Sequence, residues 1–316
     1  MIILKGVYTY NIPDTITKGI EGVRLFPISE NLAPDEFPDP ESVTLLIARQ
    51  GAVNRLLKIF PNIKWLQLLN AGYEKVDLEL LKRRNIIFTN ASSVYCKTIA
   101  EDVIAKMLIL ARNYPVHFEQ QRQSLWPDDS MLPNMNIDLE GKTVGILGAG
   151  NIGREIAVRA QAFGMTVIGY DPYVTSQAGF NKIYNRYPEL EQVLKMSDFL
   201  ITCLPVTDET RDIMNEEKFK MMKRSAFFIN VARGEIVNEN HLIEALNKGH
   251  IKGAYIDVCK EEPLPPASPV WKTKNLYITP HRAAYGDLMQ KRMAGLIERN
   301  IHHYLKNEPL ENLVHL

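Results

Sequence analysis

A glycine-rich turn near the middle of this 316-residue chain constrains its fold more than any other feature. The apolar run 143–147, typical of a buried strand, leads directly into Gly148-Ala149-Gly150-Asn151-Ile152-Gly153. A helical pattern follows, and a second apolar run, 166–170, ends at Asp171. The first glycine and this acid are 171 − 148 = 23 residues apart. This order and spacing are typical of the βαβ unit that binds a dinucleotide.

Each part of the turn has a physical role in such a unit. Gly148 permits the tight turn, Gly150 lets the backbone approach a pyrophosphate without a Cβ in the way, and Gly153 lets the helix pack close to the strand. The N–H groups at the start of the helix attract phosphate. Asp171 can accept hydrogen bonds from both ribose hydroxyls and would repel a 2′-phosphate, and the next two residues supply no arginine in its place. The sequence therefore predicts NAD as the cofactor in preference to NADP.

Short apolar runs alternate with helical patterns on both sides of this turn. Before it we expect buried strands at 2–4, 23–26, 44–48, 65–69 and 86–88, with a helix at 76–84 among them. From the turn onward we expect strands at 143–147, 166–170, 199–203, 227–230, 253–258 and 276–279. The length corresponds to about two domains at roughly 150 residues each. The sequence therefore predicts an α/β protein built on parallel sheets that helices cover.

Three other segments have distinct patterns. Residues 98–112 are expected to form a helix that is apolar nearly all round, with Thr98 and Glu101 as a capping box at its start. Residues 113–139 contain three prolines and an isolated Trp126, which is typical of a loop or arm. Residues 284–305 carry apolar side chains at helical spacing.

Composition excludes several classes of function. Lys and Arg number 37 and Asp and Glu number 37, and this zero net charge argues against a nucleic-acid partner. The three cysteines are widely spaced with no CxxC pair, so neither a disulfide framework nor a metal site is expected. The first residues lack the features of a signal peptide, and no apolar run approaches the roughly 20 residues that span a membrane. We therefore expect a cytoplasmic protein without a membrane partner.

Three further segments lie at or just after expected strand ends, where open α/β sheets bind ligands. They contribute Arg233, Glu262 and His281, in that order along the chain. Reduction of a 2-keto acid needs a cation for the carboxylate and a proton donor for the carbonyl oxygen. Arg233 suits the first need because its planar fork matches a carboxylate, and His281 suits the second because an imidazole titrates near neutrality. Glu262, if it hydrogen-bonds His281, would favour the charged imidazolium.

Each of these three residues also has an ordinary structural interpretation. A lone His281 could cap a strand or helix, and Arg233 or Glu262 could be a solvated surface residue. Their joint placement after the glycine-rich turn favours the catalytic interpretation.

Together the motifs resemble the D-isomer-specific 2-hydroxyacid dehydrogenases over nearly the whole chain. The residues that carry the resemblance are Asn70-Ala71-Gly72-Tyr73, the run 92–102, the turn 148–153 with Asp171, the run 204–210, Val231-Ala232-Arg233-Gly234, Asp257 with Glu262-Pro263, and Thr279-Pro280-His281.

The resemblance implies a role for each matching residue. Arg233 would bind the substrate, Glu262 and His281 would be the acid–base pair, and the N–H groups of Gly72 and Tyr73 would hold the substrate carboxylate. Ten residues would contact or shape the cofactor site: Thr98, Gly148, Gly150, Asn151, Ile152, Gly153, Asp171, Pro205, Thr210 and Asp257.

The resemblance also implies a domain arrangement. Residues 1–98 with 286–316 would form a flavodoxin-like substrate domain, and a Rossmann NAD-binding domain, 99–285, would be inserted into it. The arm at 113–139 resembles the segment through which these enzymes dimerise, so a homodimer is expected. At this length we expect the short form, without a C-terminal regulatory domain.

Several residues depart from the family pattern or lack an assigned role. Tyr73 stands where a small aliphatic residue is commoner, and Arg282 follows the histidine where an apolar residue is usual. Tyr73 is a candidate for shaping the substrate pocket. Arg282 either contacts the substrate or pairs with an acidic residue, and the pair is favoured. Arg49, at an expected strand end, is either a specificity residue or part of a solvated loop. Cys259 replaces a frequent Phe and is expected to be buried packing.

We therefore expect an oxidoreductase that transfers a hydride between NAD(H) and C2 of a small 2-hydroxy or 2-keto acid, of the glyoxylate, hydroxypyruvate, pyruvate or branched-chain class. One alternative is a dehydrogenase for a different small acid, although Glu262 argues against the formate branch, where a glutamine is typical. The other alternative is an NAD-sensing corepressor on the same scaffold, although 316 residues leave no room for a partner-binding extension.

Overall fold

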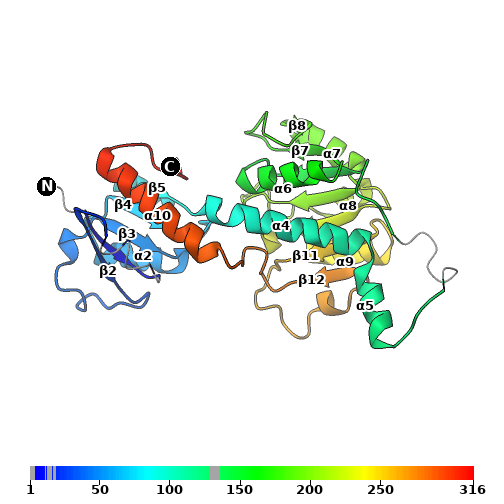
Figure 1. The fold of residues 1–316 in the computed structure, drawn as a ribbon, viewed down its shortest axis with the longest axis horizontal. Coiled ribbons are helices and arrows are strands. Elements are labelled where there is room, and N and C mark those ends of the chain that lie inside the picture. The colour runs from blue at the N-terminus through cyan, green and yellow to red at the C-terminus, as the bar shows by residue number, and fades with distance from the viewer. Residues whose placement is uncertain (1–3, 11, 13–15, 17–18, 129–135) are drawn as a thin grey trace. The chain divides into compact units, whose positions relative to one another are not determined.

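The computed structural model describes residues 4–10, 12, 16, 19–128 and 136–316. The chain divides into two units, Met1–Tyr95 with Gly286–Leu316 and Cys96–Tyr285. We call them unit 1 and unit 2 and describe each by itself (Figure 1). The start of the first expected strand, residues 2–3, and residues 129–135 of the expected arm lie outside the described residues.

Unit 1 is built on a five-stranded parallel sheet in the order β2-β1-β3-β4-β5. In sequence order this is 2-1-3-4-5, the flavodoxin-like doubly wound topology. The strands are β1 (Leu4–Tyr8), β2 (Val23–Pro27), β3 (Leu45–Ala48), β4 (Trp65–Leu68) and β5 (Ile87–Thr89). Its described helices include α2 (Gln50–Ile59), α3 (Leu78–Arg83) and α10 (Met289–Lys306).

The pleat of β3 separates two cores in unit 1, because alternate side chains of a strand point to opposite faces. Leu46 and Ala48 pack in the core that includes the buried face of α2. Leu45 and Ile47 pack in the other core, with Met293, Leu296, Ile297 and Ile301 of α10. The helix near the end of the chain therefore covers one face of the sheet that the beginning of the chain forms (Figure 1).

Unit 2 contains a seven-stranded parallel sheet in the order β12-β11-β10-β9-β6-β7-β8. Numbered within the unit, this order is 3-2-1-4-5-6-7, which is the Rossmann pattern with one added strand. The strands are β6 (Thr143–Leu147), β7 (Thr166–Tyr170), β8 (Lys182–Tyr184), β9 (Phe199–Thr202), β10 (Phe227–Asn230), β11 (Gly253–Ile256) and β12 (Leu276–Ile278). The helices are α4 (Ser92–Ala111), which begins in unit 1, α5 (Tyr114–Arg122), α6 (Asn151–Ala162), α7 (Leu190–Met196), α8 (Glu216–Met221) and α9 (Glu239–Asn247). Both sheets confirm the α/β class.

Two local expectations were wrong. The capping box of Thr98 and Glu101 does not exist, because α4 begins at Ser92 and Thr98 lies inside it. Residues 114–122 of the expected arm form helix α5, which has Pro115 in its first turn, a position that proline tolerates. One strand was missed: the edge strand β8 has three residues and begins with a lysine, so it carries little apolar signal.

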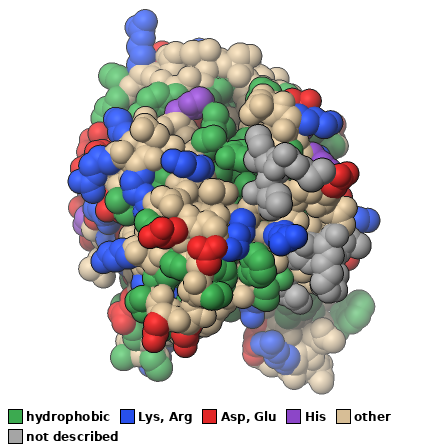
Figure 2. All heavy atoms as spheres, turned by 90° about the vertical axis from the view of Figure 1, so that its left-hand side faces the viewer, with side chains coloured by type: hydrophobic (Ala, Val, Ile, Leu, Met, Phe, Trp, Pro, Cys, Tyr) green, Lys and Arg blue, Asp and Glu red, His purple; other side chains and the backbone are tan. Residues whose placement is uncertain are grey.

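The surface and the interior agree with a neutral globular chain. Figure 2 shows basic and acidic side chains interspersed over the visible face. Cys96, Cys203 and Cys259 are all free. Within the described ranges, no helix is long and apolar enough to cross a membrane, and no group of His, Cys, Asp and Glu is arranged to hold a metal ion.

Candidate active site

The glycine-rich turn connects β6 to α6 and fits a dinucleotide pyrophosphate. Gly148 has φ +105°, and a Cβ on Gly153 would lie 2.1 Å from the oxygen of Gly148, so both positions need glycine for the turn itself. A Cβ on Gly150 would meet no protein atom within 4 Å. Gly150 also provides no side-chain cap for the N–H groups that begin α6. Open space beside the start of a helix that has no side-chain cap is what a bound phosphate requires.

Asp171 follows β7 and is 8% exposed. One of its oxygens accepts the N–H of Ala149 at 2.8 Å. The other accepts the N–H groups of Tyr173 and Val174 at 2.9 and 3.1 Å. A carboxylate has about four acceptor positions, so three backbone bonds leave about one. In this conformation Asp171 therefore ties the turn to its own strand end and has room for about one ribose hydroxyl.

A short loop after β9 brings Pro205 and Thr210 together. The Thr210 hydroxyl donates to the carbonyl oxygen of Pro205 at 2.7 Å and accepts the N–H of Thr207 at 2.7 Å. These bonds shape the loop that the resemblance places along the cofactor. Thr98 lies one turn and a half into α4 and is half-buried.

Arg233 sits in a tight turn after β10 that its neighbours fix. The buried Asn230 accepts the N–H of Ala232 at 3.0 Å and donates to the carbonyl oxygen of Arg233 at 3.0 Å. A Cβ on Gly234 would lie 2.0 Å from the carbonyl carbon of Cys259. The glycine therefore lets the Arg233 turn pack directly on the loop after β11, which carries Glu262.

Glu262 and His281 form an ion-pair geometry at the ends of two adjacent strands. Oε2 of Glu262 lies 2.7 Å from Nδ1 of His281, and Oε1 accepts the N–H of Cys259 at 3.0 Å. The side chains are 38% and 48% exposed, so a ligand can reach them. Because Nδ1 faces the carboxylate, Nε2 is the nitrogen that can face a substrate. The structure therefore contains the Glu262–His281 contact on which the suggested role of Glu262 depends.

Asp257 holds the turn that carries His281. Its Oδ1 accepts the Thr279 hydroxyl at 2.5 Å and the N–H of Arg282 at 3.0 Å, and its Oδ2 accepts the N–H of Ala283 at 2.8 Å. The N–H of His281 donates to the Asp257 carbonyl oxygen at 2.7 Å. His281 itself has φ +53°, an uncommon conformation for a residue other than glycine. Asp257 thus holds the turn that contains His281. The sequence predicted only a role for Asp257 at the cofactor.

The sequence interpretation missed two charged residues on α4. Lys106 is 1% exposed and pairs with Asp102, and its Nζ lies 3.6 Å from Oδ1 of Asp257. Burial raises the pKa of Asp102, although the hydrogen bond from Lys106 opposes that rise. A signal was present, since an Asp and a Lys four residues apart lie on the same side of a helix and a buried lysine is rarely found without an oppositely charged partner.

Gly72 and Tyr73 lie in unit 1, as do Asn70 and Arg49. Within the described part of the chain, no backbone carbonyl oxygen accepts the N–H groups of Gly72 and Tyr73. The Tyr73 ring packs edge-on against Phe88, with centroids 5.5 Å apart, so its side chain serves the unit's core. The Arg49 guanidinium lies 5.6 Å from the centroid of the Tyr10 ring.

The other two departures have defined surroundings. The guanidinium of Arg282 lies over the ring of Tyr285, 4.4 Å from its centroid, and both residues are exposed. Cys259 is 7% exposed and packs in the core of unit 2, and burial raises the pKa of its thiol to about 11. It is therefore buried packing, as expected.

Comparison with known proteins decides the family. The family model described as "D-isomer specific 2-hydroxyacid dehydrogenase, NAD binding domain" matches residues 104–283, more than half of the chain. The chain belongs to this family. The suspected family and its dehydrogenase class are confirmed, and the matched residues lie within unit 2.

Individual relatives extend the likeness to the whole chain. A glyoxylate reductase of Korarchaeum cryptofilum is 30% identical and is matched over 95% of this chain and 94% of its own length. A D-3-phosphoglycerate dehydrogenase of Methanocaldococcus jannaschii is 30% identical over 99% of this chain, which spans 60% of that longer protein. The solved D-isomer specific 2-hydroxyacid dehydrogenase of Xanthobacter autotrophicus Py2, in complex with NADPH and MES, is 29% identical, with a TM-score of 0.80 and 98% of each chain covered.

Proposed function

We propose that this protein transfers a hydride between NAD(H) and C2 of a small 2-hydroxy or 2-keto acid. The observation that carries the proposal is the Glu262–His281 pair at 2.7 Å, on a strand-end loop that Gly234 packs against the Arg233 turn. The glycine-rich turn lies at the same carboxyl edge of the same sheet, where open α/β sheets bind their ligands. In this proposal unit 2 is the NAD-binding domain and unit 1 is the substrate domain.

The chain's own residues supply binding and proton transfer. Arg233 binds the substrate carboxylate through two parallel N–H donors. We also assign a carboxylate-binding role to the N–H groups of Gly72 and Tyr73 in unit 1. His281 holds a proton on Nε2 for the substrate oxygen, and Glu262 fixes the ring through Nδ1 and balances the imidazolium charge. When bound, the nicotinamide supplies or receives the hydride.

The proposed substrate class rests on the two kinds of group that the chain offers, carboxylate binders and a proton donor, and on the names of its relatives. A carboxylate site and one proton donor suit any small 2-keto acid. Relatives named glyoxylate reductase and glyoxylate/hydroxypyruvate reductase B support glyoxylate and hydroxypyruvate as the first candidates. Pyruvate and branched 2-keto acids complete the class that we propose.

We propose NAD as the preferred cofactor because the Asp171 carboxylate would repel a 2′-phosphate. The effect needs only its negative charge, so it does not depend on how many ribose hydroxyls Asp171 accepts. Because the Xanthobacter relative was solved in complex with NADPH, the preference for NADH has to be measured directly.

We also propose that the protein is a cytoplasmic homodimer. Beside α5 the chain exposes several large apolar side chains, with Phe118 at 53% and Trp126 at 96%. Tyr114 and Phe118 stack at 5.8 Å, and a hollow next to them is lined by residues that include Leu110 and Pro115. Large exposed apolar patches usually mark an interaction surface. Sedimentation of the double variant Phe118→Asp, Trp126→Ala should give a smaller particle than the wild type.

One experiment tests the proposed activity. NADH and NADPH absorbance is followed with glyoxylate, hydroxypyruvate, pyruvate and a branched 2-keto acid, alongside direct titration of NADH binding. We expect turnover with at least one acid and a higher kcat/KM with NADH. If NADH binds tightly but is not consumed in the presence of any of these acids, the enzyme proposal is overturned and the NAD-sensing corepressor is favoured.

A further inference from the structure

Lys106 is an unusual residue for the middle of α4. It is 1% exposed, and its neighbours on the buried side of the helix include Val103, Met107 and Leu110. A buried cation is costly unless oppositely charged groups compensate it. Here Asp102, one turn earlier, contacts its amino group directly. The Tyr255 ring on β11 also faces the amino group, with its centroid 5.1 Å away.

The second carboxylate beside Lys106 belongs to a different part of the fold. Asp257 follows β11, and its side chain is 2% exposed, against 31% for Asp102. Its Oδ1 lies 3.6 Å from Nζ of Lys106. Lys106 is therefore the cation that compensates a deeply buried carboxylate, while Asp102 holds the amino group from the more exposed side.

The Asp257 carboxylate also fixes the histidine turn. It accepts the Thr279 hydroxyl and the N–H groups of Arg282 and Ala283, at 2.5, 3.0 and 2.8 Å. These donors lie on both sides of His281, whose φ of +53° requires the surrounding structure to hold it. The turn therefore depends on the position of the Asp257 carboxylate, because one side chain accepts all three of these hydrogen bonds.

We propose that Lys106 is a positioning residue for His281: its buried amino group holds the Asp257 carboxylate in place, and Asp257 holds the backbone of residues 279–283. The proposal rests on the proposed function for its catalytic meaning, because it assumes that His281 transfers the proton. Its structural part, the rigidity of the turn, does not depend on turnover.

The competing explanation is that Lys106 only neutralises Asp102 and stabilises α4. A variant that removes both charges separates the two. Asp102→Asn with Lys106→Met changes shape little and leaves no unpaired charge on the helix, but it deprives Asp257 of its cation. Lys97→Met, on the exposed side of the same helix, is the matched control. Asp257→Asn is the positive control, because it removes the charge that holds the turn.

The first readout is hydrogen exchange of the Arg282 and Ala283 amides in the protein without cofactor. We expect exchange about tenfold faster in the double variant and in Asp257→Asn, and unchanged exchange in Lys97→Met. The second is kinetics, where we expect kcat to fall about tenfold with little change in the KM for NADH, since a displaced proton donor affects the chemical step. Thermal unfolding verifies that each variant is folded. If Asp102→Asn with Lys106→Met does not fold, Asp102→Leu with Lys106→Met takes its place.

Wild-type exchange in a folded double variant, with acceleration in Asp257→Asn, would overturn the proposal. A different result would contradict the proposed function instead: faster exchange in the double variant, combined with full activity in His281→Asn. In that case Lys106 would still position the turn, but His281 would not be the proton donor. The two failures are therefore distinguishable.

Discussion

Oε2 of Glu262 lies 2.7 Å from Nδ1 of His281, while Oε1 of the same carboxylate accepts the backbone N–H of Cys259 at 3.0 Å. One carboxylate thus joins the loop after β11 to the turn after β12. The backbone bond fixes the carboxylate, and the carboxylate fixes the ring. His281 therefore presents Nε2 in a defined direction.

Glu262→Gln should separate the charge of this contact from its shape. Glutamine can still hydrogen-bond the ring, but it cannot balance an imidazolium. We expect kcat for 2-keto acid reduction to fall about 10- to 100-fold, within the range that a positioned acid–base group contributes, while NADH affinity stays the same. Stopped-flow reduction and NADH fluorescence titration measure the two quantities. An unchanged kcat would contradict the role of the carboxylate.

Arg233→Lys should weaken substrate binding more than turnover at saturation. A lysine keeps the positive charge but cannot form two parallel hydrogen bonds with a carboxylate. We expect the KM for the keto acid to rise about 10- to 100-fold, since a bidentate charged contact is worth roughly 1.5–3 kcal/mol. Arg224→Lys, in a turn elsewhere in unit 2, is the control and should keep the wild-type KM.

Asp171→Asn tests the proposed cofactor preference. Removing the negative charge should raise the ratio of kcat/KM for NADPH to that for NADH by about tenfold or more, because the repulsion of a 2′-phosphate is lost. The variant should also be less stable by about 1–2 kcal/mol, since an amide cannot replace all three backbone contacts of the carboxylate. Glu191→Gln, which removes a charge on α7, is the control and should leave the cofactor ratio unchanged. A ratio of kcat/KM for NADPH to that for NADH that stays at its wild-type value would contradict the proposed role of Asp171.

The thiols of Cys203 and Cys259 should resist alkylation in the folded protein. Burial raises the pKa of Cys203 from the ordinary 9.0 to about 12 and that of Cys259 to about 11, so both remain protonated at pH 8. The unfolded chain loses these protons nearer pH 9. Their contribution to the free energy of unfolding is therefore complete below pH 9 and is lost as pH rises toward 11–12. Iodoacetamide labelling followed by mass spectrometry, native and in urea, checks this; rapid native labelling of either thiol at pH 8 would contradict it.

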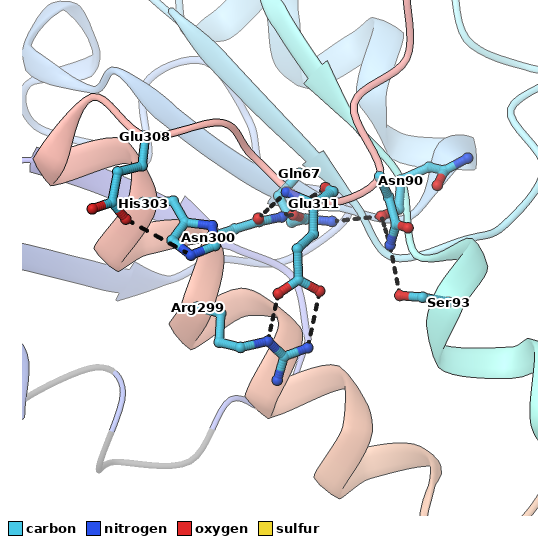
Figure 3. Close-up of polar contacts among 9 residues, drawn as sticks. Gln67, Asn90, Ser93, Arg299, Asn300, His303, Glu308 and Glu311 are labelled. Atoms are coloured by element: carbon cyan, nitrogen blue, oxygen red, sulfur yellow. Dashed lines mark hydrogen bonds and ion pairs between the residues drawn. The ribbon is translucent and has the colours of Figure 1, made fainter.

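Asn300→Ala should destabilise unit 1. Figure 3 shows Asn300 between Gln67 and the end of the chain. Its amide donates to Gln67 at 2.9 Å and to the carbonyl oxygen of Glu311 at 3.1 Å, and its oxygen accepts the Glu311 N–H at 2.7 Å. Losing these contacts leaves polar groups without partners, so we expect a loss of about 2–3 kcal/mol. Urea unfolding measures it, with His302→Ala, exposed on the same helix, as the control. Equal midpoints for the two variants would contradict the prediction.

Most strands could be predicted because their signal is local. The runs 143–147, 166–170 and 227–230 coincide with β6, β7 and β10, since a fully buried parallel strand is continuously apolar. The edge strand β8 is half-exposed and escaped detection for the same reason. The start of α4 was misplaced because an acceptable capping pattern at Thr98 lay inside a helix that tertiary packing extends to Ser92.

By itself the sequence determined the glycine-rich turn and the order of Arg233, Glu262 and His281, because a positive φ, a close backbone approach and a choice of side chain are properties of single positions. The tertiary structure decided what each charge faces. It placed Lys106 against Asp257 across 151 residues, 257 − 106, and filled most of the Asp171 carboxylate with backbone N–H groups. Strand order in the sheet brings distant chain segments to one edge, and no local pattern records which of them meet.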